Sequence, residues 1–539
     1  MGSEPKADLI LKNATVWTVD PSLPRAEAAA IKGTRILAVG QDAEMESLIG
    51  AGTEILDLGG RLVLPGFHDN HTHFVTWALA SAGSFDLYGA DTLEEVQKRV
   101  KRGDRDHPGE DWLWGMRWQP LMFDDGWPNA MDLDAAVRGR PIAILDIDGH
   151  TGWVNSKGLE RLGYDASTPD PLGGTILRDA SGNPTGILLE NAHESIPRKE
   201  PTGYEEVKAA LLGEIVKLNR LGITSLSDNF TPLEIMEQCA LIAEEGALNL
   251  RINYWPLLME EFDSALVSRK QFANNPRIQV VGLKALVDGV LSSRTAWMLE
   301  PYPDSSQEAG YPLVDMEELA NLALQADKEG FQLVIHAIGD RAAREVLNVY
   351  ERVARENGPR DRRHRIEHLE VIHPLDQKRM AELGVVAAMM PGHYCEPLNF
   401  QGTYKDLEVQ YQGKMSVWRT FVDMGVHLSF GTDWPAMDTE QPDPLQQIFA
   451  AVARVPPQMP DAQPKNPEQA LTIEQAIRSY TMECAYAEFT DDVKGSITAG
   501  KYADLCVLDR NILEIDPKEI LDTKVVMTVF DGQVVFSDI

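Results

Sequence analysis

Two histidines near residue 70 have the spacing of a metal-binding pair. The chain reads Gly66-Phe67-His68-Asp69-Asn70-His71-Thr72-His73 directly after the apolar run Leu62-Val63-Leu64. If that run is a strand leading into the histidines, side chains alternate between its faces, so His71 and His73 point the same way. Two imidazoles projecting together from the end of a buried strand can hold a metal ion. Because His-x-His pairs also arise by chance, the pair alone leaves a metal site and a coincidence open.

Four further residues suited to metal chemistry fall at the ends of other strand-like runs: Lys284, His336, His368 and Asp433. In a parallel barrel, the carboxyl ends of the strands converge on one mouth. With His71 and His73, four of the chain's 12 histidines stand at the ends of strand-like runs. That number indicates a shared site. For Lys284 the ordinary alternative is an exposed charge at the end of a strand.

The elements that must position these residues follow a βα pattern. Strand-like runs alternate with helix-like ones, which is typical of a parallel sheet. Besides the strand before His71, the runs are Gly222–Asp228, Leu250–Trp255, Ile278–Lys284, Gln332–His336, Arg363–His368, Val385–Met390 and Val426–Asp433, eight in all. A (β/α)8 TIM barrel needs eight such units. The stretch from His73 to Gly222 is too long for one crossover helix, so we expect an inserted subdomain at 80–205.

Short β-rich segments stand at both ends of the chain. They are Leu9–Leu11, Thr15–Val19 and Arg35–Gly40 near the start, and Leu505–Leu508, Val525–Phe530 and Val534–Phe536 near the end. One small β-sandwich domain built from both chain termini accounts for them, and two unrelated β appendages are the alternative. The predicted fold class is thus α/β: a TIM barrel over 65–484, a composite β-sandwich over 1–64 and 485–539, and an α/β insertion after barrel strand 1.

Composition excludes several classes of partner. The 539 residues carry a formal net charge of -33, which argues against nucleic acid or an anionic membrane as a partner. The four cysteines are Cys239, Cys395, Cys484 and Cys506; their wide spacing predicts neither a disulfide framework nor a Cys-x-x-Cys metal site, and it fits a reducing compartment. No signal peptide or membrane-spanning apolar run is visible. We therefore expect a cytoplasmic protein that acts on a small molecule.

Several phrases resemble motifs of the amidohydrolase superfamily. Pro65–His73 resembles its first-strand motif, and Gly495–Ile497 with Gly500–Leu505 resembles its C-terminal return to the small sheet domain. The phrases Asp148–Ser156, Gly182–Gly186, Lys284–Gly289, His336–Asp340 and Arg365–His368 narrow the resemblance to amidohydrolase family 3, the branch that includes N-substituted formamide deformylases. The resemblance extends over nearly the whole chain.

That resemblance implies a centre of two divalent metal ions. His71, His73 and Asp433 would bind one ion, His336 and His368 the other, and Lys284 would bridge them as a carbamate formed with CO2. A protonated lysine cannot ligate a metal because it has donors and no acceptor, whereas a carbamate is a carboxylate-like anion. Zinc is the metal that the resemblance implies, although these ligand types also accept Mn, Co or Fe. A hydroxide shared by the two ions would attack a carbonyl, and Asp433 would carry its proton to the leaving amine.

Other residues are candidates for binding the substrate. His150 in the insertion is suited to an oxyanion donor, with a hydrogen-bonded turn histidine as the alternative. Asp288, Arg294 and His393 follow predicted barrel strands and would line the mouth, and Trp434 beside Asp433 would wall the pocket. For the tryptophans of the insertion, Trp112, Trp114 and Trp118, packing in its core is the favoured explanation.

Three functions compete. The first is a binuclear hydrolase of amides, with N-acyl or N-formyl amines as substrates. The second is a mononuclear deaminase of a heterocycle, which gets by without a bridging lysine, so Lys284 argues against it. The third is a scaffold that kept the barrel and lost catalysis, and the presence of all six candidate ligands argues against that. Exposed surfaces on the insertion would suit a homodimer.

Overall fold

The computed structural model of the protein describes residues 5–109, 111–119, 127–147, 149, 151–171, 174–197, 203–292, 294–303, 309–397, 399–436 and 440–539. The chain divides into two compact units. The first comprises residues 1–73, 212–433 and 442–539, and the second comprises 74–211 and 434–441.

Parallel strands form the centre of the first unit. One sheet has the strand order β17-β16-β15-β8 and another the order β18-β19-β20-β21-β22, and neighbouring strands in both are parallel. The strands are β8 (Phe67–Thr72), β15 (Ile223–Asn229), β16 (Arg251–Trp255), β17 (Ile278–Gln279), β18 (Gly282–Leu286), β19 (Gln332–Ala337), β20 (Arg365–His368), β21 (Val386–Met389) and β22 (Leu428–Phe430). Nearly all of their residues are buried, as expected for parallel sheets covered by helices.

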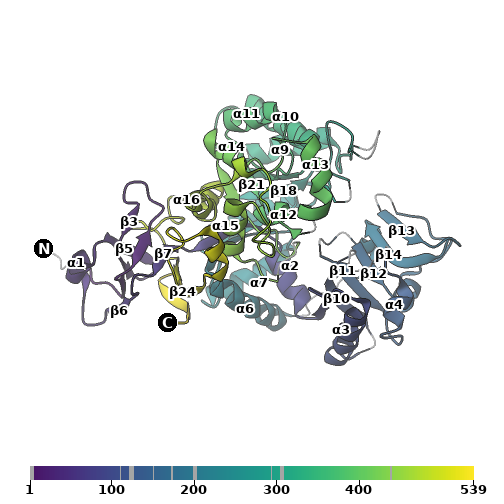
Figure 1. Ribbon diagram of the computed structural model, residues 1–539, viewed down its shortest axis with the longest axis horizontal. Helices are drawn as coiled ribbons and strands as arrows, with labels where there is room; N and C mark the ends of the chain where they lie inside the picture. Colours follow the sequence, from purple (N-terminus) through teal and green to yellow (C-terminus); the bar gives the residue numbers. More distant parts are fainter. Residues whose placement is uncertain are drawn as a thin grey trace. The chain divides into compact units, whose positions relative to one another are not determined.

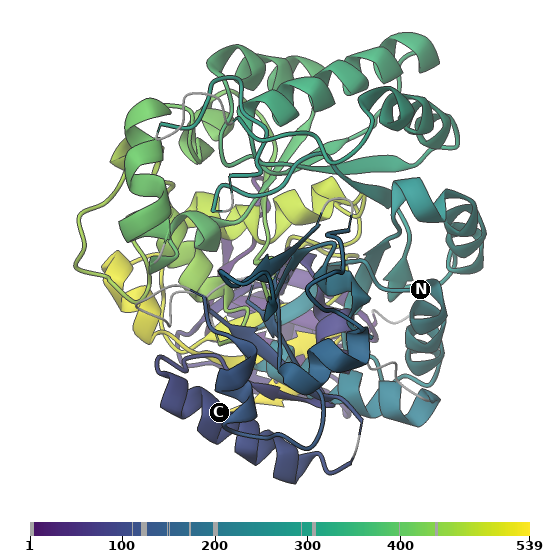
Figure 2. The same cartoon turned by 90° about the vertical axis from the view of Figure 1, so that its right-hand side faces the viewer.

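Helices follow the strands and cover them. They are α6 (Tyr204–Arg220), α7 (Leu233–Glu244), α8 (Leu258–Gln271), α9 (Met316–Lys328), α10 (Asp340–Asn357), α11 (Pro374–Leu383), α12 (Pro391–Tyr394), α13 (Tyr404–Gln410), α14 (Trp418–Asp423), α15 (Pro444–Ala453), α16 (Ile473–Ser479) and α17 (Met482–Ala487). In α10 the buried residues Ala343, Val346, Tyr350 and Val353 recur every three or four positions, which is the spacing of one helix face. Figure 2 shows helices of this unit, in teal and green, outside the strands.

The strand that carries the histidine pair is not the apolar run predicted from the sequence. Leu62–Pro65 is β7, which belongs to a different sheet, and the histidines follow from the separate strand β8. β8 is buried at every position although most of its residues are polar. Gly66 separates the two strands, and a Cβ atom there would lie 2.3 Å from Oγ1 of Thr224. The prediction was wrong because buried polar strands lack the hydrophobic pattern that marks ordinary ones.

Two predicted strand ends also differ from the structure. Lys284 lies in the middle of β18 instead of at the end of a run that began at Ile278. Asp433 lies three residues beyond the end of β22, in a loop, and has a φ of 60°. The strands are shorter or displaced, yet each residue still follows or lies within a strand of the parallel set.

The two chain ends fold together. Strands from both ends make the sheet β25-β24-β23-β7-β2-β3, and N-terminal strands make a second sheet, β5-β4-β1-β6. The strands are β1 (Leu9–Lys12), β2 (Thr15–Trp17), β3 (Arg25–Ala26), β4 (Ala28–Lys32), β5 (Arg35–Gly40), β6 (Glu54–Asp57), β7 (Leu62–Pro65), β23 (Leu505–Leu508), β24 (Val525–Phe530) and β25 (Gln533–Ser537), with α1 (Asp42–Met45) after β5. Purple and yellow segments therefore lie side by side in Figure 1. One buried apolar cluster contains Leu11, Ile31, Val507 and Val529, so the ends are not unrelated appendages.

The second unit contains a sheet of its own, in the order β13-β14-β12-β11-β10-β9. Its strands and helices are α2 (Phe74–Ser81), β9 (Ser84–Asp86), α3 (Leu93–Asp106), β10 (Leu113–Trp118), α4 (Ala130–Asp134), β11 (Ile142–Asp146), β12 (Thr151–Val154), α5 (Ser156–Leu162), β13 (Gly174–Arg178) and β14 (Pro184–Glu190). Trp118 is fully buried in an apolar cluster, and Trp112 and Trp114 pack against another, so core packing of these tryptophans is confirmed. Among the described residues, no helix is long and apolar enough to cross a membrane.

Candidate metal centre

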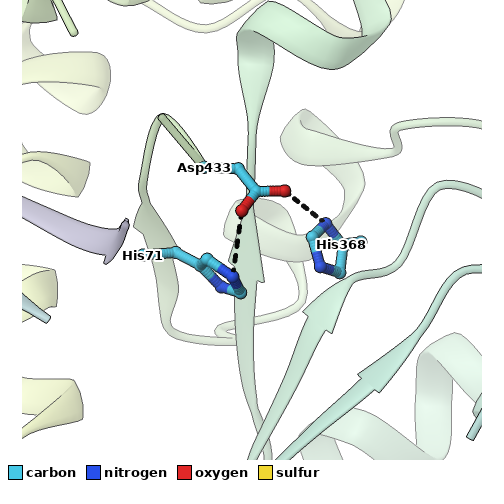
Figure 3. A group of neighbouring side chains, drawn as sticks. All are labelled: His71, His368 and Asp433. Carbon is cyan, nitrogen blue, oxygen red and sulfur yellow. Dashed lines mark ion pairs between the residues drawn. The ribbon is translucent and has the colours of Figure 1, made fainter. Parts of the chain in front are cut away.

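Three buried side chains converge where strands of the parallel set end. His71 comes from β8, His368 is the last residue of β20, and Asp433 follows β22; one donor atom from each lies within 4.8 Å of the others. In Figure 3 the two oxygens of Asp433 point to different histidines: Oδ1 lies 3.2 Å from Nε2 of His71 and Oδ2 lies 4.0 Å from Nδ1 of His368. Residues in or after three separate strands of the parallel set thus form one His-His-Asp group.

His73 approaches the same carboxylate as His71. Its Nε2 lies 3.1 Å from Oδ1 of Asp433, and its ring stacks on Phe230 with the centroids 5.0 Å apart. Burial opposes the charge on Asp433, but the neighbouring imidazoles hold the pKa of Asp433 well below its usual range. The group therefore offers two imidazoles around one ionised carboxylate.

His336 extends the group on the other side. It lies on β19, and its ring centroid is 4.4 Å from that of His368. Nε2 of His336 is 3.3 Å from the carbonyl oxygen of Gly289. Burial, with a further contribution from the Lys284 charge, lowers the pKa of His336 to about 3. The ring is therefore neutral near pH 7, and neutral imidazole is the form that binds metals.

Lys284 is enclosed. It is 1 % exposed, which excludes the alternative of an exposed charge at a strand end. Its Nζ makes no hydrogen bond with any residue that the structure describes. Burial lowers the pKa of Lys284 to about 8, although the charges of Glu367 and Asp433 oppose that shift. An amine so placed is neutral more often than an ordinary lysine, and the neutral amine is the form that reacts with CO2.

Buried polar atoms without a hydrogen bond test whether these residues fit metal ions. Besides Lys284 Nζ, the buried atoms Asp433 Oδ1 and His368 Nδ1 lack a hydrogen-bond partner within the described part of the chain. Buried polar atoms without partners are rare and costly, and a bound ion would satisfy them. Imidazole and carboxylate donors suit Zn, Mn, Co or Fe. The residues therefore fit divalent metal ions.

Two of the candidate ligands have an unusual backbone conformation. His368 has a φ of 73° and Asp433 a φ of 60°, a region that residues other than glycine seldom adopt. Such conformations gather at functional sites, where surrounding contacts hold them.

His393, predicted to contact substrate, lies against this group. It comes from α12, and its ring stacks on that of His368 with the centroids 5.7 Å apart. Its Nε2 is 3.4 Å from Oδ2 of Asp433 and its Nδ1 is 3.6 Å from Oε1 of Glu370. Burial opposes a charge on this ring, but Glu370 and Asp433 outweigh it and raise the pKa of His393 to about 9.

Asp288, another predicted substrate contact, lies beside His336, with its Oδ1 3.6 Å from Nε2 of that ring. Both oxygens of Asp288 accept hydrogen bonds from the backbone amides of Ile338, Gly339 and Trp297, which favours a structural role over contact with substrate. Arg294 is exposed, with a φ of 61°. Trp434 is 4 % exposed and packs edge-on against Trp77, with the centroids 4.8 Å apart. His150 lies outside the described residues.

Glu367, which contacts His71, was not predicted from the sequence to belong to this site. Its carboxylate lies against Nδ1 of His71 and accepts a hydrogen bond from Nε of Arg365 at 2.9 Å. Burial opposes its charge, but Arg365 and His71 lower the pKa of Glu367 to about 2. The only signal was its place beside His368 in the phrase Arg365–His368, and a partner nearly 300 residues away cannot be deduced from that.

Comparisons with known proteins span nearly the whole chain. A model described as "Amidohydrolase family" matches residues 54–536. The chain is 32% identical over 532 residues to Protein LONG AFTER FAR-RED 3 of Arabidopsis thaliana, covering 95% of this chain and 89% of that protein. It is 30% identical over 543 residues to an N-substituted formamide deformylase of Arthrobacter pascens, covering 97% of each. The crystal structure of an uncharacterized metal-dependent hydrolase from Pyrococcus horikoshii matches at a TM-score of 0.75 and 25% identity, covering 94% of this chain and 99% of that chain.

Proposed function

Because the chain belongs to the amidohydrolase family and is a metal-dependent hydrolase, we propose that it cleaves the C–N bond of a small-molecule amide. The substrate would be an N-acyl or N-formyl amine. One observation carries the proposal: a fully buried lysine with an unpaired amine, Lys284, lies among the strands that bring His71, His368 and Asp433 together. The similarity to an N-substituted formamide deformylase supports the choice of amide.

We also infer that the parallel strands form a closed (β/α)8 barrel. β17 and β18 are separated by two residues and count as one strand, so the four and five strands of the two sheets make eight. An isolated parallel bridge between Leu257 and Lys284 joins one pair of sheet edges. At the other pair of edges, the amide of Asp433 donates to the carbonyl oxygen of His71 at 2.8 Å. On this inference the terminal sheets form the predicted β-sandwich, and the second unit is the insertion.

The residues divide into two sets of metal ligands. His71, His73 and Asp433 would hold one ion, His336 and His368 would hold the other, and carbamylated Lys284 would bridge them. When bound, divalent ions such as zinc would polarise the amide carbonyl and lower the pKa of water towards neutrality. All of these side chains except that of His73 are buried, and the exclusion of bulk solvent strengthens the electrostatic interactions in the site.

Asp433 is placed to move the proton. Its Oδ2 faces His393 at 3.4 Å and its Oδ1 faces His71 and His73. As an ionised carboxylate it would accept the proton of the attacking water and donate it to the amine nitrogen as the C–N bond breaks. His393, held by Glu370, would bind the substrate beside this carboxylate.

An assay panel after metal exchange tests the proposal. Protein stripped with a chelator, dialysed, and reloaded with Zn²⁺ in bicarbonate should release amine from N-formyl and N-acyl amines, and the stripped protein should not. Amino-heterocycles, followed by ammonia release, provide the matched set of substrates for a deaminase. Ammonia from that set without amine from the first would overturn the proposal, because only a deaminase gives that result.

A further inference from the structure

Glu367 and Arg365 form a buried pair behind one of the candidate ligands. Both side chains are 0 % exposed. Oε1 of Glu367 accepts from Nε of Arg365 at 2.9 Å, and Oε2 of the same carboxylate lies against Nδ1 of His71. The other ring nitrogen, Nε2 of His71, faces Asp433. One side of the His71 ring is thus held by the protein, and the other side faces the metal centre.

Arg365 determines that the carboxylate of Glu367 is a hydrogen-bond acceptor. A guanidinium has donors only and does not lose its proton, so Glu367 must accept from it. Nη2 of Arg365 also donates to the carbonyl oxygen of Asn70 at 2.9 Å, one residue before His71. Its guanidinium carbon lies 4.3 Å from the ring centroid of Trp255. These contacts leave the carboxylate little freedom to turn away from His71.

We propose that Glu367, oriented by Arg365, is a positioning residue that keeps the proton of His71 on Nδ1 and leaves Nε2 free for a metal ion. A carboxylate paired with Arg365 accepts and does not donate, so the atom facing it on His71 must carry the proton. The opposite tautomer would place a hydrogen on Nε2, and a protonated nitrogen cannot ligate a metal. The inference rests on the proposed role of His71 as a ligand.

The chain contains a matched control at a distance from the candidate ligands. Oε1 of Glu483 pairs with Nε of Arg478 at 2.7 Å, and its Oε2 lies 2.6 Å from Nδ1 of His427. The same three residue types therefore meet through the same atoms in a second place. Glu483→Gln makes the same chemical change as Glu367→Gln without touching a ligand.

Glu367→Gln should move the proton of the His71 ring from Nδ1 to Nε2. Arg365 offers only donors, so the new amide must turn its oxygen to Arg365 and its NH2 group to Nδ1 of His71. That ring would then carry its proton on Nε2. We expect the affinity of metal-free protein for Zn²⁺, measured by competition with a chromogenic chelator, to fall about 10- to 100-fold. Glu483→Gln should leave that affinity unchanged.

A second substitution separates positioning from a general structural role. In Arg365→Met/Glu367→Gln, the amide is free to turn its oxygen to His71, so Zn²⁺ affinity should recover relative to Glu367→Gln. If removal of Arg365 lowers the affinity further, the inference is overturned. Wild-type protein that binds no Zn²⁺ would instead overturn the proposed function, so the two failures are distinguishable.

The tautomer can also be measured in metal-free wild-type protein, so this test does not require Glu367→Gln to fold. In ¹⁵N-histidine-labelled, metal-free wild type, the His71 resonances, assigned by their loss in His71→Gln, should report a proton on Nδ1. A proton on Nε2 would contradict the inference even if Glu367→Gln failed to fold.

Discussion

Replacing Asp433 with asparagine should lower kcat on the best amide substrate by about three orders of magnitude, equivalent to about 4 kcal/mol of transition-state stabilisation. Asparagine is nearly isosteric, but it has no charge and cannot take up and return a proton. The substitution removes an anionic donor from the point where His71, His73 and His393 converge. Steady-state kinetics with metal-loaded protein measure the effect.

Two controls make that result interpretable. Asp315→Asn changes an exposed aspartate that caps α9 through the amides of Glu317 and Glu318, and asparagine caps a helix equally well, so activity should be retained. Metal content of Asp433→Asn, measured on the same sample, separates lost proton transfer from lost metal. Turnover near the wild-type value in Asp433→Asn would contradict the role given to this carboxylate.

Replacing Lys284 with alanine should lower activity at least about 100-fold, since the variant cannot form the bridging anion. In the proposed wild-type centre, the neutral amine would add to CO2 and lose one proton, giving a carbamate. Removing the side chain empties an enclosed space beside the candidate ligands. Short carboxylates such as formate or acetate carry the same anionic group, so they should restore part of the activity when added at high concentration.

The matched control is Lys328→Ala, which removes an exposed lysine at the end of α9. It should retain activity and show no response to added carboxylates. Full activity in Lys284→Ala, with or without carboxylate, would make Lys284 an ordinary buried lysine.

Part of this architecture could be predicted because local sequence patterns indicate it. Alternating strands and helices indicated the parallel α/β arrangement, and the β-rich ends indicated a shared terminal sheet. Most residues that meet around Asp433 were also predicted, because strand ends in a parallel set gather at one edge. His71 and His73 were predicted to face the same way, and both face one oxygen of Asp433.

Other features depend on contacts that no local pattern contains. The run Leu62–Leu64 looked like the strand before the histidines because it is apolar, but it pairs with the terminal strands, and the polar segment Phe67–Thr72 takes the central place. Glu367 contacts His71, and His393 lies between Glu370 and Asp433. Each of those partners is fixed by tertiary packing. Substrate specificity depends on loops whose shape the sequence pattern does not specify.

The binuclear centre is tested most directly by the number of metal ions per chain, determined by elemental analysis of protein purified in the presence of bicarbonate. A binuclear centre bridged by Lys284 should give two divalent ions per wild-type chain, falling to one or none in Lys284→Ala. A single ion that is unaffected by Lys284→Ala, or no ion in a folded wild-type protein, would contradict the binuclear centre and the amide chemistry proposed for it.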